Sequence, residues 1–233
     1  AAFTVGLTAV SALLGVSLGV ACGWARAWGP AWLKWVVGAY VELIRNTPFI
    51  VQLFFVFFGL PSLGVRLTPE LASVIAMVVN LGAYAAEIAR AGIEGTPRGQ
   101  IEAARSLALN ERQVFLRVVL PPALARVWPA MTSQIVIVML GSAVCGQIAA
   151  QELSYYANLI QSRNFRAFEA YIIATAIYLA LAFALRQALA LFVEMELHCV
   201  AGDLDEATDL SHRALAIFRR LDDHWGISAI QYH

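Results

Sequence analysis

The chain has 233 residues, of which 60% are hydrophobic and 14% are charged, and its formal net charge at pH 7 is zero. This composition is too apolar for an ordinary soluble domain. The apolar residues also gather into runs long enough to cross a bilayer of about 30 Å. The sequence therefore predicts an all-α, polytopic membrane protein whose surroundings are membrane lipid, and no nucleic-acid partner is expected.

Five stretches without a charged residue predict transmembrane helices, because flanking residues can extend each one toward the roughly 20 residues that a spanning helix needs. In chain order they are residues 1–25, 46–65, 71–86, 127–151 and 170–185. The second stretch contains Gly59 and Pro61, so it could instead be a buried or re-entrant segment. The first ten residues include neither Met nor a basic residue, which predicts that residues precede Ala1 and that this stretch is not a signal peptide.

Basic residues predict the orientation, because Lys and Arg are retained on the cytoplasmic side of a membrane. The segments expected on that side are the one between the third and fourth stretches, with Arg90, Arg98, Arg105, Arg112, Arg117 and Arg126, and the one between the first two, with Arg26, Lys34 and Arg45. The opposite loops hold only Arg66, Arg163 and Arg166. We therefore expect the N-terminus outside and residue 193 inside.

The polar segment 97–124 is predicted to begin with a helix. Pro97 suits a first helical turn, and Thr96 can cap the free backbone N–H groups. Three small residues are expected to keep one side of this helix thin enough for another protein to approach: Ala103, Ala104 and Ala108. Polar contacts are expected from Glu102, Arg105 and Arg112. From these features alone, a coupling surface and a solvated connector both remain open.

The order of residues in this segment resembles a known motif. Gly99, Gln100, Glu102, Ala103 and Ala104, followed by Phe115, Leu120, Pro121 and Ala123, resemble the EAA loop of bacterial ABC importer permeases of the polar amino acid (His/Glu/Gln/Arg-type) branch. Further matching positions are Arg45, Asn46, Thr47, Pro48 and Gln52; Tyr84, Glu87, Arg90 and Gly92; and Glu152, Leu153, Phe165, Glu169, Tyr171 and Tyr178. The resemblance covers residues 4–190.

The resemblance implies an amino acid permease with about five transmembrane helices and a cytoplasmic coupling helix. It implies contact with a separate ATPase through the loop 94–124, at Gly99, Gln100, Glu102, Ala103, Ala104, Arg105 and Ala108. Its implied partners are two ATPase subunits, a second permease in a homodimer or heterodimer, and an extracytoplasmic substrate-binding protein. The location it implies is the bacterial inner membrane.

Two positions depart from the family pattern. Ala108 stands where the family usually has Gly, so the turn after the coupling helix lacks its easiest left-handed residue, and Asn110 is expected to take over this C-cap. In the fourth stretch the family's K-D/S-T-S-L reads Leu140, Gly141, Ser142, Ala143 and Val144. The missing lysine implies a changed substrate preference or a divergent subunit paired with a more typical one.

The sequence predicts no catalytic chemistry in this chain. A P-loop needs Gly-x-x-x-x-Gly-Lys-Ser/Thr, but Lys34 is the only lysine and Trp35 follows it. ATP and Mg²⁺ are therefore expected on the partner ATPase, and no cofactor or metal is expected here. The three cysteines, Cys22, Cys145 and Cys199, have no metal-ligand spacing and are interpreted as small core residues.

Polar side chains within the apolar stretches are candidates for the substrate path, because such groups are costly in lipid. They are Gln52, Asn80, Tyr84, Glu87, Gln134, Ser142 and Gln147. Asn80, Tyr84 and Glu87 share one helical face by their spacing. Alternatively, the amides form interhelical hydrogen bonds and Glu87 pairs with Arg90. Glu87 is the candidate acceptor for a substrate ammonium, and Gln52 the candidate donor for its carboxylate.

The composition changes near residue 194. Residues 1–193 carry thirteen basic and eight acidic side chains, whereas residues 194–233 carry three basic and eight acidic ones. We therefore predict a permease domain at 1–193 and a separate helical tail at 194–233 that resembles one tetratricopeptide-like repeat. Its apolar positions are Ala207, Leu210, Ala214, Ile217 and Leu221. A single repeat cannot bury this face alone. The tail therefore either docks on the membrane unit or a partner, or is unrelated sequence joined by a frameshift, a gene-prediction error or a spliced assembly.

Two other functions remain open at this stage. The helices could only anchor a scaffold or sensory protein whose repeat-like tail recruits a soluble regulator. They could also form a passive channel, which predicts transport that does not respond to an ATPase.

Overall fold

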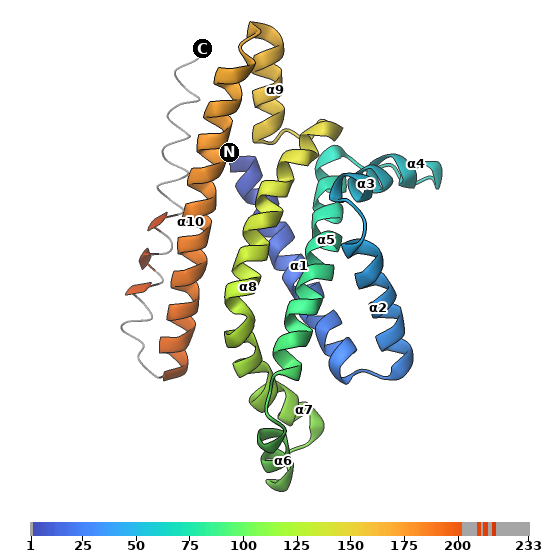
Figure 1. Ribbon diagram of the computed structural model, residues 1–233, viewed down its shortest axis with the longest axis vertical. Helices are drawn as coiled ribbons and strands as arrows, with labels where there is room; N and C mark the ends of the chain where they lie inside the picture. The colour runs from blue at the N-terminus through green and yellow to red at the C-terminus, as the bar shows by residue number, and fades with distance from the viewer. Residues whose placement is uncertain (1, 202–208, 211, 214–215, 218–233) are drawn as a thin grey trace. The chain divides into compact units, whose positions relative to one another are not determined.

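The computed structural model describes residues 2–201 and, beyond them, residues 209, 210, 212, 213, 216 and 217. Every regular element in this described part is a helix (Figure 1). The α-helices are α1 (Ala2–Trp28), α2 (Ala31–Arg45), α3 (Phe49–Phe54), α4 (Leu60–Ser62), α5 (Pro69–Glu94), α6 (Arg98–Ser106), α7 (Glu111–Val114), α8 (Leu120–Gly141), α9 (Leu153–Asn164) and α10 (Ala167–Ala201). Two π-helical turns, η1 (Phe55–Gly59) and η2 (Phe115–Val119), and a 3₁₀ helix, η3 (Ser142–Ile148), continue α3, α7 and α8.

The chain divides into two compact units. One contains the residues up to Ala9, Thr68–Ser73 and the chain from Ile135 onward, and the other contains Val10–Leu67 and Val74–Gln134. We call them the first and the second unit. The second holds most of α1 and α5, the whole of α2 to α4, α6 and α7, and the first two-thirds of α8.

The predicted membrane spans are confirmed at four places. Among the described residues, four helical segments are long and apolar enough to cross a membrane: Ala2–Trp28, Pro69–Glu94, Glu111–Ile148 and Ala167–Leu191. The fifth candidate is a bent pair, Ala31–Arg45 with Phe49–Ser62, whose two halves meet at 108°. The fold is therefore all-α with four or five apolar spans, as the sequence predicts.

The expected loop between the first two spans is wrong, because residues 31–45 form α2. Its charged residues Lys34, Glu42 and Arg45 hide the helix in a hydropathy pattern, while Val37 and Val41 are buried against the neighbouring helices. The break follows at Asn46–Pro48, where Pro48 disfavours helical geometry in the preceding residue. The second span is thus a broken helix that includes the predicted loop.

Glycines spaced four apart bring α1 close to α5 inside the second unit. A Cβ at Gly19 would lie 2.3 Å from the Cβ of Ala85, and one at Gly23 would lie 2.7 Å from that of Ala89. Gly15 meets Leu81 in the same way. Small residues at this spacing let membrane helices pack with their backbones close together. The contact sets the height of α1 along α5, and hence which side chains meet at their lower ends in Figure 1.

The loop that follows α5 contains three of the predicted features, of which two need correction. α6 begins at Arg98 directly after Pro97, as expected, but Thr96 caps nothing: its buried hydroxyl has no hydrogen-bond partner in the described part of the chain. Ala108 itself adopts the left-handed conformation, with φ 56°. Asn110 does not take over this role, because it is the N-cap of α7 and exchanges hydrogen bonds with Gln113 in a capping box.

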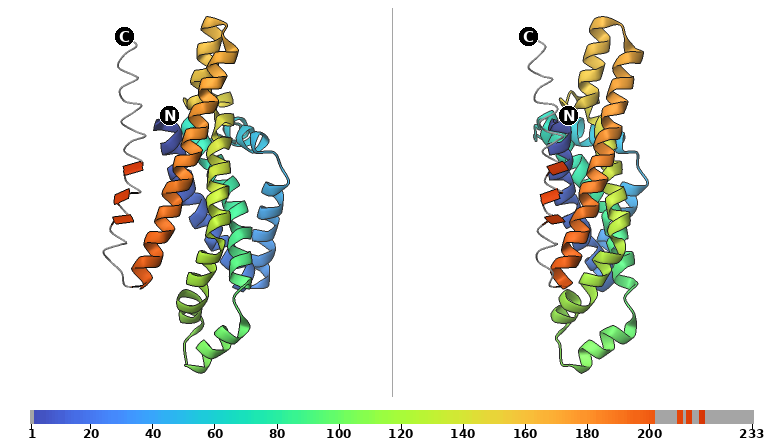
Figure 2. Two further views of the ribbon diagram at one scale, coloured as in Figure 1. Left: turned by 60° about the vertical axis from the view of Figure 1, so that its left-hand side comes forward. Right: turned by 90° about the vertical axis from the view of Figure 1, so that its left-hand side faces the viewer.

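In the first unit, α9 packs beside the start of α10, as both views of Figure 2 show. α10 continues to Ala201 without a break at residue 194. Of the predicted tail positions, Leu210 is buried and Ile217 is half-buried near Gln187 and Leu191 of α10. Ala207, Ala214 and Leu221 lie outside the described residues.

Candidate functional site

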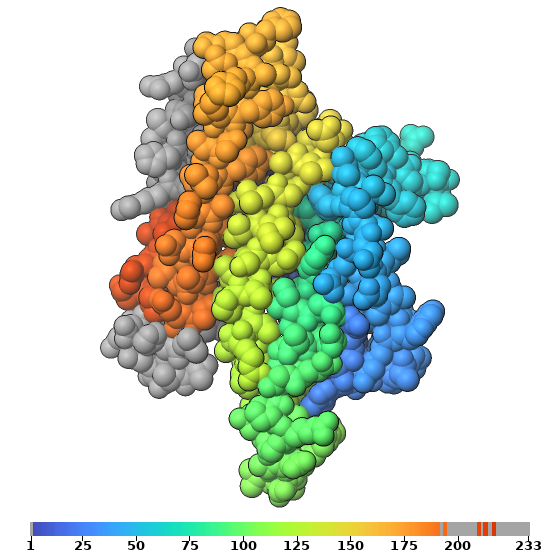
Figure 3. Space-filling model, in the orientation of Figure 1, coloured from blue at the N-terminus to red at the C-terminus, as the bar shows by residue number. Residues whose placement is uncertain are grey.

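The loop between α5 and α8 forms a projecting lobe at one end of the second unit (Figure 3). Its inner side is a small core in which Ala104 of α6 is buried with Ile93, Val114, Val119 and Ala123. The expectation that Ala104 leaves room for a partner is therefore wrong, because its methyl group faces the chain's own helices.

The outer side of α6 is open. With 100° between successive residues, Gly99, Glu102 and Ser106 lie about 140° to 160° around the helix from Ala104, Ala103 lies about 100° from it, and all four are exposed. Gln100, Arg105 and Ala108 are exposed at the margins of this face. A Cβ at Gly99 would meet no heavy atom within 4 Å, so the first turn is bare backbone. We call Gly99, Glu102, Ala103 and Ser106 the outer face of α6.

The lobe is braced internally by charged and polar pairs. Arg105 donates two hydrogen bonds to Glu111, at 2.9 and 3.0 Å, which join α6 to α7. These bonds raise the pKa of the Arg105 guanidinium above its ordinary value. The capping box at Asn110 and Gln113 holds the first turn of α7. Arg105, expected to contact a partner, is therefore already engaged within the lobe.

An aromatic contact joins the lobe to the end of α1. The ring of Phe115, in the π-turn η2, lies 5.5 Å from that of Trp28 and 6.4 Å from that of Trp24, centroid to centroid. Such tilted and edge-on pairs are favourable beyond their buried area. The lobe is thus connected to α1 through side-chain contacts and to α5 and α8 through the backbone.

The polar face of α5 is partly a structural network. Gln52 is buried, and its amide nitrogen donates to the carbonyls of Ile44 and Thr47 and to the Thr47 hydroxyl, at 2.7 to 3.0 Å. Its side-chain oxygen accepts from the Asn80 amide at 2.9 Å. Gln52 therefore ties the two halves of the broken span together and links them to α5. The structure brings these two candidates together in the interhelical bond that the sequence left open.

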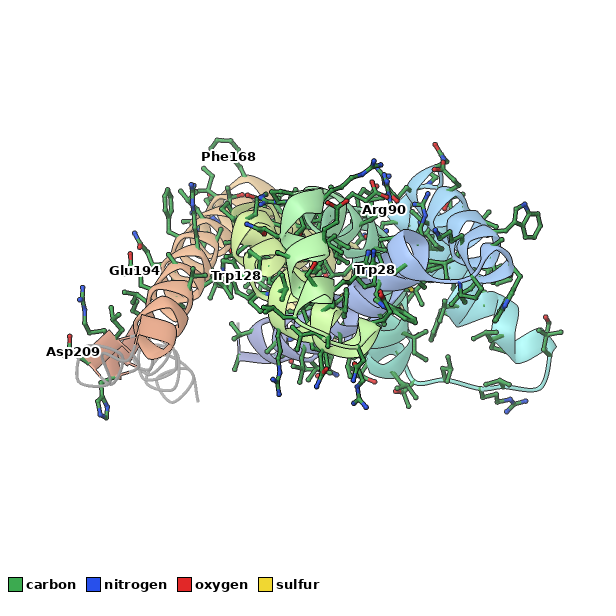
Figure 4. All side chains as sticks on the ribbon, turned by 90° about the horizontal axis from the view of Figure 1, so that it is seen from below. Trp28, Arg90, Trp128, Phe168, Glu194 and Asp209 are labelled. Carbon is green, nitrogen blue, oxygen red and sulfur yellow. The ribbon has the colours of Figure 1, made fainter. Side chains whose placement is uncertain are left out.

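About two turns beyond Asn80 on α5, Glu87 is the centre of an ionic cluster. Its carboxylate is hydrogen-bonded by Arg90, which confirms the predicted i, i+3 pair, and is also paired with Arg26 of α1. The Arg45 guanidinium stands 3.7 Å away at the end of α2. Arg90 additionally pairs with Glu94 at 2.6 Å. Figure 4 looks along the helices from the lobe and labels Trp28 and Arg90 on the two helices that meet here.

Sequence reasoning missed Arg26 and Arg45 as partners of Glu87, because it placed both in a loop. The sequence contains a signal for Arg26. The spacing of Gly15, Gly19 and Gly23 predicts that α1 packs closely on another helix, and Arg26, three residues beyond Gly23, lies at that contact. Tyr84, the third candidate on α5, lies beneath Arg45, whose guanidinium carbon is 5.5 Å from the ring centroid.

The remaining path candidates are less connected. Gln134 is half-buried in the second unit, and Gln147 is exposed. Ser142, in the first unit, is buried and donates to the carbonyl of Met139 at 2.6 Å. The described residues contain no group of three His, Cys, Asp or Glu side chains arranged to hold a metal ion.

A second carboxylate within the apolar part of the chain is Glu152 in the first unit. It is fully buried and caps α9 by accepting from the Tyr155 N–H at 2.7 Å. The hydroxyls of Ser154 and Tyr178 also donate to it. No cation pairs with Glu152 among the described residues.

Comparison with known proteins assigns this arrangement. Residues 15–195 match the family described as "Binding-protein-dependent transport system inner membrane component". The chain is 38% identical over 149 residues to the probable glutamine ABC transporter permease protein GlnM of Bacillus subtilis (strain 168), covering 64% of this chain and 69% of that protein. It is 35% identical over 162 residues to the L-cystine transport system permease protein TcyB of the same organism, covering 70% and 69%.

Solved structures agree. A crystal structure of an amino acid ABC transporter with histidines is similar with a TM-score of 0.74 and 34% identity, covering 82% of this chain and 89% of the other. An inward-facing MetNI methionine ABC transporter, at 22% identity, shares the fold with a TM-score of 0.68, covering 82% and 92%. The helical spans, the projecting lobe and these similarities together show that the chain belongs to the family of inner-membrane permease components of binding-protein-dependent ABC transport systems.

Proposed function

We propose that this chain is the permease subunit of an ATP-driven importer of polar amino acids, coupled to a separate ATPase through the loop 94–124. The observation that carries the proposal is the lobe itself. Its outer face on α6 is exposed and, apart from Glu102, made of small residues, while its inner face is packed onto the ends of α1, α5 and α8. A protein that docks on this outer face can push on three apolar spans at once.

The named relatives support the substrate class, because they include permeases for glutamine and cystine. The proposed partners are two ATPase subunits, a second permease that is identical or similar, and an extracytoplasmic binding protein that delivers substrate. ATP and Mg²⁺ are held by the ATPase, and the permease itself performs no catalysis. In this arrangement the protein lies in the bacterial inner membrane with the lobe and residue 193 on the cytoplasmic side.

The substrate path is proposed to follow the polar face of α5. Asn80, Tyr84 and Glu87 are half-buried rather than enclosed, and such groups on a membrane-spanning helix face water or another protein rather than lipid. Gln52 holds the broken span beside this face. Gln134 and Ser142 are retained as further candidates for the path.

Co-purification with an ATPase tests the coupling. The full chain is expressed with the ATPase encoded beside it, with the outer face either natural or changed by Glu102→Lys and Ala103→Arg. The double change is expected to abolish association while the protein still inserts in the membrane, because it adds bulk and reverses charge at the docking face. Asn164→Arg, an exposed change at the end of α9, is the matched control and should leave association intact.

The result would overturn the proposal in two ways. Association that survives the double change would show that the ATPase does not dock on the outer face of α6. If the natural chain captured no ATPase, coupling through the lobe would be excluded.

A further inference from the structure

Arg45 is the least satisfied charged side chain of the ionic cluster. Its side chain is 39% exposed, compared with 20% for Arg26 and 30% for Arg90. In the described part of the chain its guanidinium makes no hydrogen bond, and its distance of 3.7 Å from Glu87 is too long for one. A guanidinium has five N–H donors, so this group has nearly its whole binding capacity available.

The position of Arg45 makes this exposure unusual. It ends α2, about 22 Å along that helix from its first residue, and stands at the break of the second span. Charged side chains within a membrane-spanning segment are costly unless they face a partner or a water-filled cavity. Interrupted helices in transporters are the places where charged substrate groups are bound. An open guanidinium at such a break therefore points to an anionic ligand.

Tyr84 supplies a second donor at the same place. Its ring supports the Arg45 guanidinium from below at 5.5 Å, which fixes the direction of the cation. The Tyr84 hydroxyl has no hydrogen-bond partner among the described residues. A planar carboxylate can accept two parallel hydrogen bonds from a guanidinium, and a phenol can donate one more.

The charge of the cluster decides which amino acids fit. Three guanidiniums, from Arg26, Arg45 and Arg90, face the two carboxylates of Glu87 and Glu94. The cluster therefore has one positive charge in excess. Arg45 is the guanidinium whose charge is least compensated, because it is the most exposed of the three and the most distant from Glu87. A bound carboxylate neutralises this charge, whereas a cationic substrate side chain is repelled by it.

We propose that Arg45 and Tyr84 bind the carboxylate of the transported amino acid, and that the surplus charge disfavours substrates with cationic side chains. The proposal rests on the proposed function and narrows its substrate class to amino acids with neutral or acidic side chains. It assigns to Arg45, at the end of α2, the carboxylate contact that the sequence placed on Gln52. The Gln52 amide nitrogen is occupied by three oxygens of its own chain.

Equilibrium binding tests the site without requiring transport. The full chain, purified in lipid nanodiscs with any subunits that accompany it, is titrated with radiolabelled L-glutamine, L-glutamate and L-cystine. Unlabelled L-glutaminamide, which lacks the carboxylate, and L-arginine are the competitors. The natural chain should bind at least one of the three labelled amino acids and should bind both competitors at least about tenfold more weakly.

The variants then separate a contact from a structural effect. Arg45→Gln should weaken binding of the labelled amino acid about tenfold and leave L-glutaminamide unchanged, while Arg45→Lys keeps part of the affinity because it keeps the charge. Tyr84→Phe should cost about threefold through one lost hydrogen bond. Arg66→Gln, a change at an exposed arginine outside the cluster, is the matched control and should have no effect.

The proposal is overturned if Arg45→Gln weakens the acid and the amide equally, if it weakens neither, or if none of the three labelled amino acids binds. Failure of the ATPase to co-purify would leave these binding ratios untouched, so a wrong coupling function and a wrong binding site give different results.

Discussion

Two carboxylates, Glu87 and Glu152, are held in opposite ways. Glu87 in the second unit is 20% exposed and faces three guanidiniums that come from α1, α2 and α5. Glu152 in the first unit is fully buried and receives only neutral donors, two hydroxyls and one backbone N–H. Glu152 is held by neutral hydrogen-bond donors, so its surroundings carry no excess charge. Around Glu87, three guanidiniums face two carboxylates, so the cluster has one positive charge in excess.

This difference separates a structural site from the proposed binding site. Every donor around Glu152 lies on α9 or α10, so the group fixes one corner of the first unit. The cluster around Glu87 joins three helices by charges that remain partly in contact with solvent, so its geometry can adjust when another charged group arrives. By burial alone, Glu152 would be the candidate for the functional carboxylate. The excess of positive charge around Glu87 is the reason that the proposed site lies there instead.

Removing the Glu152 carboxylate is expected to have the largest effect on stability. Glu152→Ala removes the acceptor of three half-buried donors, of which, in the described part of the chain, only the Ser154 hydroxyl has a second acceptor, the Ala143 carbonyl at 2.6 Å. Hydrogen bonds to charged groups contribute about 1.5–3 kcal/mol each. Because such losses are not additive, we expect the free energy of unfolding to fall by about 3 kcal/mol, measured by thermal or detergent-induced unfolding. Gln151→Ala, which removes one exposed hydrogen bond with Tyr156, is the control. Equal effects of the two changes would contradict the structural role of Glu152.

The Glu87 cluster depends on the close approach of α1 to α5. A change at the contact between these helices should therefore disturb the Glu87 cluster and leave the Glu152 site intact. Gly19→Ala places a Cβ 2.3 Å from that of Ala85, and the backbones must separate. Overpacking of this kind costs about 1–3 kcal/mol. Gly38→Ala is the matched control, since its new Cβ meets no heavy atom within 4 Å and alanine in a helix is favoured over glycine by about 0.5–1 kcal/mol. Opposite shifts of the unfolding midpoint would confirm the contact, and equal shifts would exclude it.

The stability contributions of Glu87 and Glu152 should depend differently on salt concentration. Glu87→Gln removes the shared counter-ion of three partly exposed guanidiniums, and we expect a loss of about 1 kcal/mol after allowance for solvent screening. At about 1 M salt the screening length falls to about 3 Å, so this loss should shrink. The loss caused by Glu152→Gln should stay constant, because Glu152 is fully buried and its partners are neutral. Unfolding midpoints of both variants at low and high salt measure the contrast, and a salt-dependent Glu152 effect would undermine it.

The sequence predicts local features of this protein better than contacts between distant segments. Charge-free stretches locate four spans, and the i, i+3 spacing predicts the pair of Glu87 with Arg90. The pattern misses α2, because Lys34, Glu42 and Arg45 on one side of that helix mask the apolar side. Arg26 could not be assigned to Glu87 without knowing how α1 packs on α5. Likewise, the sequence could not predict that the Ala104 side chain faces inward, because the core that buries it is formed by residues before and after α6, including Ile93 and Ala123.

A change of the uncharged residue Ala108 does not involve either carboxylate, and its effect should be the smallest of these and stabilising. Its φ of 56° is a left-handed conformation that costs a residue with a Cβ about 1 kcal/mol and glycine almost nothing. Ala108→Gly should therefore slow hydrogen exchange in the lobe by up to about fivefold, with no dependence on salt. Ala103→Gly, in the middle of α6 where the backbone is helical, should instead speed exchange, because glycine is about 1 kcal/mol less favourable there. If both changes speed exchange, the turn after α6 is not left-handed in the purified protein, and the bracing of the lobe by Arg105 and Glu111 is contradicted with it.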